Sequence, residues 1–214
     1  MNILVCGGAG FIGSSFILNY FKNNPNSKIT NLDVLTIGSN LENLKSIENN
    51  SNYKFIQDNI RNESVVDTLV KDTDVIINFA AETHVDRSIA NPKPFLDTNI
   101  LGTYSILEAT RKYDKQFIHV STDEIYGDAH GKSSFDENSQ INPSNPYAAT
   151  KAAADHLVSS YHRTYGINCI TTRCTNNFGP NQFPEKLIPK TIIRSIKNLK
   201  VPLYGDGMQI RSWI

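Results

Sequence analysis

A run of glycines directly after the first apolar stretch constrains this sequence more than any other feature. Residues 2–6 read NILVC, GGAGFIG follows at residues 7–13, and a helix-like stretch comes next. Gly7, Gly10 and Gly13 permit a tight turn and let another molecule approach the backbone. A strand, a glycine turn and a helix in this order predict the first β–α unit of a parallel sheet, with a pyrophosphate-binding loop at the helix N-terminus.

Short apolar runs alternate with helix-like stretches along most of the chain. Because the runs are apolar on both faces, they predict a parallel sheet that helices cover on both sides. Right-handed crossovers then give an α/β fold with a doubly wound, Rossmann-type sheet, whose site lies at the carboxyl ends of the strands. The expected strands are 2–6, 28–33, 53–57, 75–79, 116–121 and 168–172, and the expected helices are 11–22, 63–70, 94–113 and 146–165.

The composition excludes several classes of partner. The 214 residues carry 21 Lys and Arg against 21 Asp and Glu, so no net charge favours nucleic acid or an anionic membrane. Three cysteines without a C-x-x-C pair are typical of a reducing compartment, and the histidines lack metal-ligand spacing. The N-terminus does not resemble a signal peptide, and no apolar run has membrane-spanning length. We therefore expect a cytoplasmic protein with no metal, nucleic acid or membrane partner.

An acidic residue strengthens the interpretation of the glycine loop. Asp33 ends the second expected strand, about 20 residues beyond the last glycine, as in dinucleotide-binding units. Its carboxylate would accept hydrogen bonds from the adenosine ribose and would repel a 2′-phosphate. No arginine follows it closely. A lone glycine motif is weak evidence for a cofactor. Together with the flanking strand and helix and with Asp33, however, it predicts NAD, and not NADP, as the cofactor.

Two residues of the segment SNPYAATKAAADHL, at 144–157, are candidates for acid–base chemistry. Asn145 is a possible N-cap, with Pro146 at the first helical position. Tyr147 and Lys151 then lie four residues apart on one helix face. A neighbouring ammonium lowers the pKa of a phenol, so that the phenolate can act as a base. Taken alone, the pair is better explained by a surface tyrosine stacked on a lysine stem.

The stretch VSTDEIYG, at residues 120–127, places a hydroxyl and two carboxylates where a strand should end. Side chains of a strand alternate between faces, so Asp123 and Glu124 can both reach a substrate only if the chain leaves β geometry there. A solvated acidic pair at the start of a loop is the plain alternative. Together with Thr122, the two acids become candidates for a site.

These motifs together resemble one family. STDE-x-YG beside Y-x-x-x-K is similar to the extended short-chain dehydrogenases/reductases that dehydrate nucleotide sugars, and most similar to the dTDP-glucose 4,6-dehydratase family. The segments at 80–89, 172–189 and 203–213 (AAETHVDRSI, TRCTNNFGPNQFPEKLIP and LYGDGMQIRSW) also match that family. The resemblance covers the whole chain.

The resemblance implies a three-stage reaction on dTDP-glucose. Tyr147 would take the proton of the 4-hydroxyl while a hydride leaves C4 for NAD, with Thr122 holding the oxygen and Lys151 binding the nicotinamide ribose. Glu124 would then remove the C5 proton, and Asp123 would protonate the departing 6-hydroxyl. Return of the hydride to C6 would give dTDP-4-keto-6-deoxyglucose. Two carboxylates so close share a titration, so one can be protonated while the other is ionised.

The resemblance also assigns binding residues and a partner. A homodimer through the two long helices, 94–113 and 146–165, is expected. Besides Tyr147 and Lys151, the residues implied for the cofactor are Gly7, Gly10, Phe11, Ile12, Gly13, Asp33, Asn59, Ile60, Ala80, Ala81 and Thr98. The residues implied for the nucleotide sugar are Thr83, His84, Arg87, Asn177, Lys186, Leu187, Pro202, Tyr204 and Arg211, of which Lys186 and Arg211 suit a diphosphate.

The sequence departs from the family pattern at several points. Cys6, TIGSN at 36–40, Phe178 and Ser212 replace residues that are usual there, and members of the family continue beyond the last residue by a domain-sized stretch. We therefore expect an NAD-binding catalytic domain at 1–175 and, at 176–214, a small, truncated substrate-binding part. Two alternatives stay open: a UDP-sugar 4-epimerase or decarboxylase, and a truncated NAD-binding protein without activity.

Overall fold

The structure is a computed structural model that describes residues 1–129, 134–203 and 205–214. It contains two compact units, Met1–Cys174 and Thr175–Ile214. Among the described residues, no helix is long and apolar enough to cross a membrane.

The first unit is built on a sheet of six parallel strands in the order β3-β2-β1-β4-β5-β6. The doubly wound α/β fold predicted from the sequence is confirmed. The strand order reverses between β1 and β4, and in such sheets ligands bind at the carboxyl ends near this switch point. The strands are β1 (Asn2–Cys6), β2 (Lys28–Asp33), β3 (Tyr53–Gln57), β4 (Val75–Asn78), β5 (Gln116–Thr122) and β6 (Cys169–Cys174).

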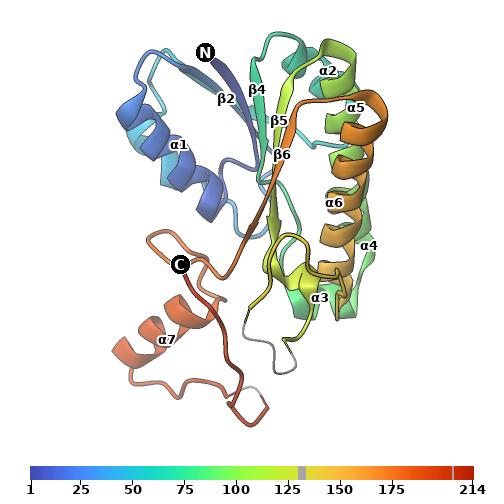
Figure 1. The fold of residues 1–214 in the computed structure, drawn as a ribbon. Coiled ribbons are helices and arrows are strands. Elements are labelled where there is room, and N and C mark those ends of the chain that lie inside the picture. Colours follow the sequence, from blue (N-terminus) through green and yellow to red (C-terminus); the bar gives the residue numbers. More distant parts are fainter. Residues whose placement is uncertain (130–133, 204) are drawn as a thin grey trace. The chain divides into compact units, whose positions relative to one another are not determined.

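Helices cover both faces of this sheet, with α1 on one side and α2, α5 and α6 on the other (Figure 1). The bounds are α1 (Phe11–Asn23), η1 (Leu41–Ile47), α2 (Glu63–Lys71), α3 (Val85–Ala90), α4 (Lys93–Phe95), η2 (Leu96–Gly102), α5 (Thr103–Tyr113), η3 (Asp123–Tyr126), α6 (Pro146–Tyr165) and α7 (Leu187–Ile196).

The alternation of side-chain direction along β1 explains why an apolar cluster lies on each face of the sheet. Ile3 and Val5 belong to the cluster on the α1 side, which also contains Ile17. Leu4 and Cys6 belong to the cluster on the opposite side, with side chains of α2, α5 and α6. Successive strand residues point to opposite faces, so one apolar pentapeptide fills both layers.

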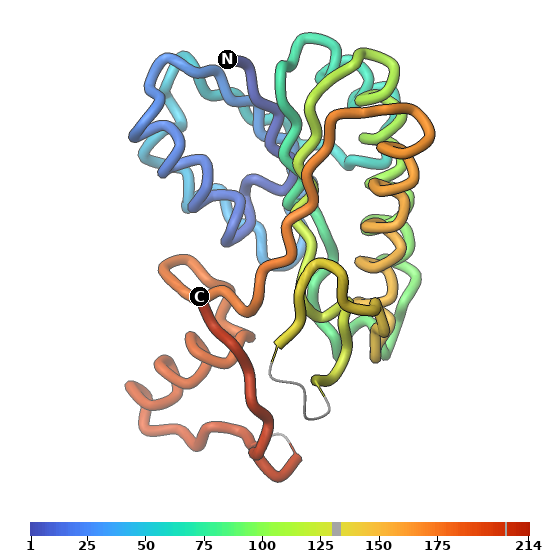
Figure 2. The backbone as a smooth tube through the Cα atoms, viewed as in Figure 1, coloured from blue at the N-terminus to red at the C-terminus, as the bar shows by residue number. Residues whose placement is uncertain are grey.

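The stretch expected as one helix at 94–113 is interrupted. It consists of α4, a π-helical segment η2 and α5. Ile60 packs against Gly102, where a Cβ would lie 2.4 Å from the Ile60 Cδ1. A wider turn at η2 accommodates this contact, and π-helical turns are frequent at functional sites. Figure 2 shows the stretch, in green, as one continuous run of coils.

The second unit contains α7 and an isolated parallel bridge between Asn176 and Trp213. Phe178 and Trp213 form an edge-on ring contact with centroids 6.4 Å apart. No residue of α7 is buried.

Candidate functional site

The glycine turn after β1 is shaped by close backbone approaches. Gly7 has φ +77°, and a Cβ on it would lie 2.5 Å from the backbone nitrogen of Ala80. A Cβ on Gly13 would lie 2.3 Å from the carbonyl oxygen of Gly7. Gly10 is the N-cap of α1, with no side-chain cap and no acidic residue in the first turn. The positive end of α1 can therefore receive a phosphate.

Asp33 lies at the carboxyl end of β2 and is 4% exposed. Its Oδ2 accepts a hydrogen bond from Ala9 N at 2.9 Å. Its Oδ1 accepts from Leu35 N at 2.9 Å and from Ser39 Oγ at 3.0 Å. These bonds fix the carboxylate beside the glycine turn, and Oδ2, which accepts one bond, still has acceptor capacity for a ribose hydroxyl.

The other residues predicted for the cofactor have different environments. Ala80 lies against Gly7, as described above, and its N–H donates to Asn78 Oδ1 at 3.1 Å. Asn59 Oδ1 accepts from the N–H of Arg61. Ile60 is 4% exposed and belongs to the core, so only its backbone could face a ligand. Of the remainder, Phe11, Ala81 and Thr98 are half-buried and Ile12 is 37% exposed.

The structure brings Thr122, Tyr147 and Lys151 together. Tyr147 lies in the first turn of α6, where Asn145 caps the helix by accepting from Ala148 N at 2.9 Å. The Tyr147 side chain hydrogen-bonds that of Thr122, the last residue of β5. Lys151 lies one helical turn further on, is 3% exposed, and donates to the carbonyl of Val120 at 2.8 Å. Two neighbouring elements thus hold the three side chains.

Burial changes the titration of this pair. Burial, followed by the charge of Glu124, raises the pKa of Tyr147, while the hydrogen bond with Thr122 acts in the opposite direction. Burial lowers the pKa of Lys151 from 10.5 to about 8. The expected lowering of the Tyr147 pKa is therefore not seen in this structure; the pKa is raised instead, because the apolar environment disfavours a phenolate.

Asp123 and Glu124 leave strand geometry, as their predicted role requires. β5 ends at Thr122, and Asp123–Tyr126 form the single 3₁₀ turn η3. Thr122 Oγ1 donates to Asp123 Oδ1 at 3.4 Å and accepts from Glu124 N at 3.3 Å. Asn145 Nδ2 donates to Glu124 Oε2 at 3.5 Å. Both carboxylates also act on the pKa of Tyr147, which places them close to the phenol.

Three residues predicted for the substrate lie between β4 and the end of α3. Thr83 is exposed, whereas His84 and Arg87 are half-buried. His84 is the N-cap of α3 and its Nδ1 accepts from Arg87 N at 3.4 Å. Thr83 and His84 precede α3, which contains Arg87 and whose Ser88 accepts from the N–H of Tyr147 at 3.1 Å.

The remaining predicted substrate residues lie in the second unit, except Tyr204, which is outside the described residues. Asn177 donates from Nδ2 to the carbonyl of Thr175 at 2.9 Å. Lys186 and Leu187 are the N-cap and first residue of α7. Pro202 and Arg211 are exposed.

Some residues that organise the site gave no signal in the sequence. Asn99 of η2 is 1% exposed; its side chain accepts from Glu82 N at 2.9 Å and donates to Glu82 O at 3.1 Å. It also donates to Thr150 Oγ1 at 2.9 Å, which joins the segment after β4 to α6. Ser39, the partner of Asp33, is a second example. Only tertiary contacts define these roles.

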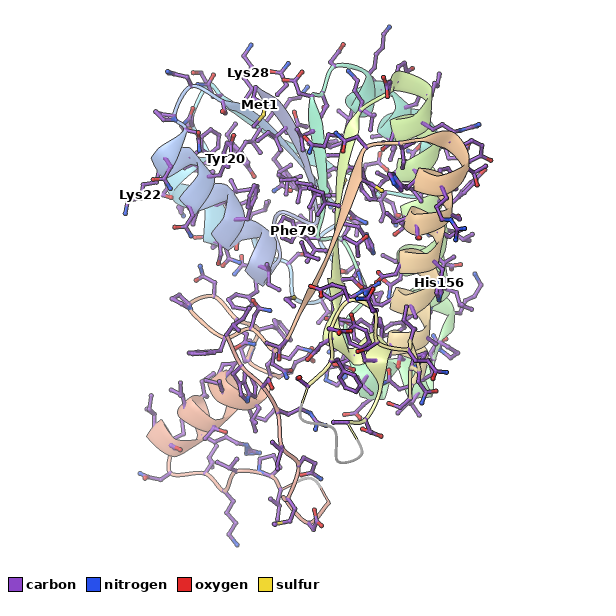
Figure 3. All side chains as sticks on the ribbon, viewed as in Figure 1. Met1, Tyr20, Lys22, Lys28, Phe79 and His156 are labelled. Carbon is purple, nitrogen blue, oxygen red and sulfur yellow. The ribbon has the colours of Figure 1, made fainter. Side chains whose placement is uncertain are left out.

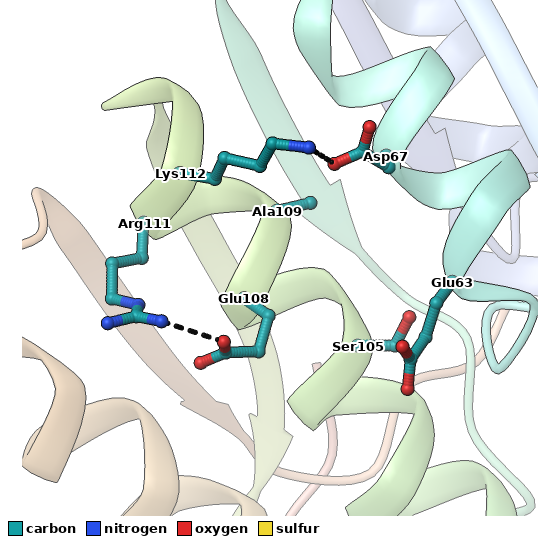
Figure 4. Close-up of a pocket in the computed structure, with 7 residues that line it drawn as sticks. All are labelled: Glu63, Asp67, Ser105, Glu108, Ala109, Arg111 and Lys112. Atoms are coloured by element: carbon teal, nitrogen blue, oxygen red, sulfur yellow. Dashed lines mark hydrogen bonds and ion pairs between the residues drawn. The ribbon is translucent and has the colours of Figure 1, made fainter.

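A separate hollow of about 370 Å³ lies between α2 and α5 (Figure 4). Four of its charged side chains form pairs, Lys112 with Asp67 at 2.6 Å and Arg111 with Glu108 at 2.9 Å, and Glu63 also lines it. None of the predicted site residues line it. On the outer surface of α6, His156 points to solvent (Figure 3). In the part of the chain that the structure describes, no group of three or more His, Cys, Asp or Glu could hold a metal ion.

Comparison with known proteins decides the family. A family model described as GDP-mannose 4,6 dehydratase matches residues 4–214. The chain belongs to the nucleotide-sugar 4,6-dehydratase family. Within the 4,6-dehydratases, the resemblance drawn from the motifs is confirmed, since the chain is similar to dTDP-glucose 4,6-dehydratases over its whole length.

Curated relatives of this 4,6-dehydratase-family chain are longer. The low-salt glycan biosynthesis protein Agl12 of Haloferax volcanii is 48% identical, with 100% of this chain and 69% of the relative covered. The dTDP-glucose 4,6-dehydratase of Neisseria gonorrhoeae is 46% identical, with 100% and 65% covered. The chain thus spans about two thirds of the length of the curated relatives that it matches.

A solved structure also matches. DesIV, a dTDP-glucose 4,6-dehydratase from Streptomyces venezuelae, was solved with NAD and a second ligand bound. It superposes with a TM-score of 0.97 at 41% identity, covering 100% of this chain and 68% of DesIV. The fold of the 4,6-dehydratases is therefore present here.

Proposed function

We propose that this chain dehydrates dTDP-glucose to dTDP-4-keto-6-deoxyglucose with NAD as cofactor. The observation that carries the proposal is the arrangement at the end of β5, where Thr122 hydrogen-bonds Tyr147 and the acids Asp123 and Glu124 follow in one turn. A hydroxyl base and a separate acid–base pair on neighbouring elements are what oxidation followed by loss of water needs.

The residues at the start of the sheet fit a dinucleotide. The turn formed by Gly7 and Gly13 has no room for a Cβ, and the N-terminus of α1 carries no acid. Asp33 is fixed at the end of the next strand, where a ribose would lie. When bound, NAD would supply a hydride acceptor for C4 of the sugar and a hydride donor for C6. The solved relative with NAD bound supports this choice.

Tyr147 would act first, by taking the proton of the sugar 4-hydroxyl. Its raised pKa means that the resting phenol keeps its proton, so the base form depends on positive charge beside it. The buried Lys151 ammonium, one turn along α6, is placed to supply such charge. Thr122, whose hydroxyl lies beside the Tyr147 phenol, would hold the 4-oxygen.

The acids of η3 would then eliminate water. A ketone at C4 makes the C5 proton acidic, and Glu124, which Asn145 orients, would remove it. Asp123 would donate a proton to the 6-hydroxyl as the C6–O bond breaks, so that water leaves. Return of the proton to C5 and of the hydride to C6 would complete the turnover. Asp123 must be protonated while Glu124 is ionised, and adjacent carboxylates favour such a split.

The proposal extends to the whole protein. Residues 1–175 would bind NAD and carry the chemistry, and 176–214 would contribute to binding of the nucleotide sugar. Partners would be the substrate and a second copy of the chain, joined through the long helices, in the cytoplasm.

Mass spectrometry of dTDP-glucose incubated with the chain and NAD tests the proposal. The expected product is lighter by one water. Asp123→Asn should keep C4 oxidation but stop water loss, so that reduced nicotinamide accumulates. Asp67→Asn, on the outer helix α2, is the matched control and should behave as wild type. Wild-type protein that binds NAD but leaves the sugar unchanged and reduces no nicotinamide would contradict the proposal, and a C4 epimer of unchanged mass would indicate an epimerase.

A further inference from the structure

A buried ionic network lies one helical turn beyond Lys151. Asp155 of α6 is 3% exposed, and its Oδ2 accepts from Arg173 Nε, on β6, at 2.9 Å. Its Oδ1 has no hydrogen-bond partner among the described residues and lies 3.6 Å from Nε2 of the buried His119 of β5. A buried carboxylate is costly unless it is compensated by charge and hydrogen bonds. The reaction proposed above makes no use of this group.

Arg173 extends the network to the turn that carries the two acids. Its Nη1 donates to the hydroxyl of Tyr126, in η3, at 2.8 Å and to the carbonyl of Glu137 at 3.3 Å. The guanidinium also lies 5.4 Å from the centroid of the Tyr126 ring. One arginine therefore links α6, β6 and η3.

Asp155 also acts on Lys151. The two residues are four apart on α6 and share one face of the helix. Burial lowers the pKa of Lys151 to about 8, and the charge of Asp155 acts in the opposite direction. His119 contributes no positive charge, since burial and then the charge of Lys151 lower its pKa well below the ordinary value.

We propose that Asp155 is a positioning residue for the reaction: it faces Lys151 with a fixed negative charge, and through Arg173 it ties the helix of Tyr147 to the turn of Asp123 and Glu124. This inference rests on the proposed function of that site. Arg173 supplies the positive charge and the hydrogen bond that compensate this buried carboxylate.

Other groups around Lys151 cannot replace Asp155. On α6 the further titratable neighbour is Tyr147, whose pKa is raised, so that it is uncharged near neutral pH. β5 contributes the neutral His119, and β6 contributes Arg173 and the thiol of Cys174, which also acts on the pKa of Lys151. The acids of η3, Asp123 and Glu124, act on Tyr147. Asp155 is thus the carboxylate placed to hold the Lys151 charge.

Two substitutions test the inference. In Asp155→Asn, which keeps the shape, the pKa of Lys151 should fall by about one unit, as expected for loss of a nearby opposite charge. In Arg173→Gln, the buried Asp155 carboxylate loses its compensating charge and tends to take up a proton, so the pKa of Lys151 should also fall. The Lys151 ammonium is titrated by NMR on the full chain with labelled lysine side chains and NAD present, with Lys151→Arg used to assign the signal.

Activity gives the second readout. The alkaline limb of the kcat–pH profile should move to lower pH in Asp155→Asn and in Arg173→Gln, and return toward wild type in Asp155→Glu. Asp67→Asn should leave the profile in place. If the Lys151 titration is unchanged in Asp155→Asn, or moves to higher pH, the inference is wrong. Wild-type protein without dehydration would count against the proposed function alone, because the Lys151 titration does not depend on turnover.

Discussion

At the scale of single residues, the glycine turn depends on the missing Cβ atoms of Gly10 and Gly13. Gly13 has no room for a Cβ beside the Gly7 carbonyl, whereas a Cβ on Gly10 would meet that oxygen at 3.4 Å, an ordinary contact. Gly10 also has an extended backbone that any residue adopts, with φ −73° and ψ 174°. The two glycines therefore have separable roles, one in folding and one in the approach of a ligand.

Substitution by alanine should separate these roles. We expect Gly13→Ala to lower the melting temperature of the free chain, because two backbone segments must move apart. Gly10→Ala should melt as wild type but bind NAD about tenfold more weakly, a loss of about 1.4 kcal/mol, because the methyl group occupies the path of the pyrophosphate. Calorimetric melting and NAD titration provide the measurements. Equal NAD affinity of Gly10→Ala and wild type would show that the pyrophosphate lies elsewhere.

At the scale of elements, the sequence predicted the features that depend on residues close together in the chain. Short apolar runs predicted the six strands, and the spacing of Tyr147 and Lys151 placed both on α6. Asp155 continues the same spacing, but only the contact with Arg173 gives it a role. The interruption at η2 was not predicted, because the contact between Gly102 and Ile60 joins residues far apart in the sequence. Asn99 was missed for the same reason.

The side chain of Asn99, in η2, contributes measurably to the free energy of unfolding. Asn99→Ala would remove three hydrogen bonds and leave the backbone of Glu82 and the hydroxyl of Thr150 without this partner in a dry interior. We expect a loss of about 2–4 kcal/mol in the free energy of unfolding, since each unsatisfied buried group costs about 1–3 kcal/mol. Urea unfolding measures it. Asn19→Ala, on the exposed face of α1, is the control, and an equally small effect of both substitutions would contradict the role given to Asn99.

At the scale of the whole molecule, the first unit has a large apolar cluster on each face of its sheet. Apolar side chains remain on its surface along the stretch from α4 to α5. Leu96 is 43%, Leu101 52% and Tyr104 40% exposed. Single exposed apolar residues are ordinary, but a contiguous set indicates an interaction surface. This is the stretch through which we propose that two copies associate.

Disruption of this surface should change the oligomeric state. We expect wild-type protein to sediment as a dimer and Leu101→Asp to sediment as a monomer, because an isologous interface would bury the new carboxylate twice. Ile37→Asp, at a residue of 66% exposure in the loop after β2, is the matched control and should remain dimeric. Wild-type protein that is monomeric at every concentration would rule out the dimer.

The regular spacing along α6 restricts how this segment can change during evolution. Tyr147, Lys151 and Asp155 recur every four residues, whereas His156, Ser159 and Ser160 face solvent. An α-helix turns about 100° and rises about 1.5 Å per residue, so one inserted residue between Lys151 and Asp155 would rotate the carboxylate away from both the ammonium and Arg173. We therefore expect substitutions on the exposed face of α6 to be tolerated, whereas insertions or deletions between Tyr147 and Asp155 should disrupt the site.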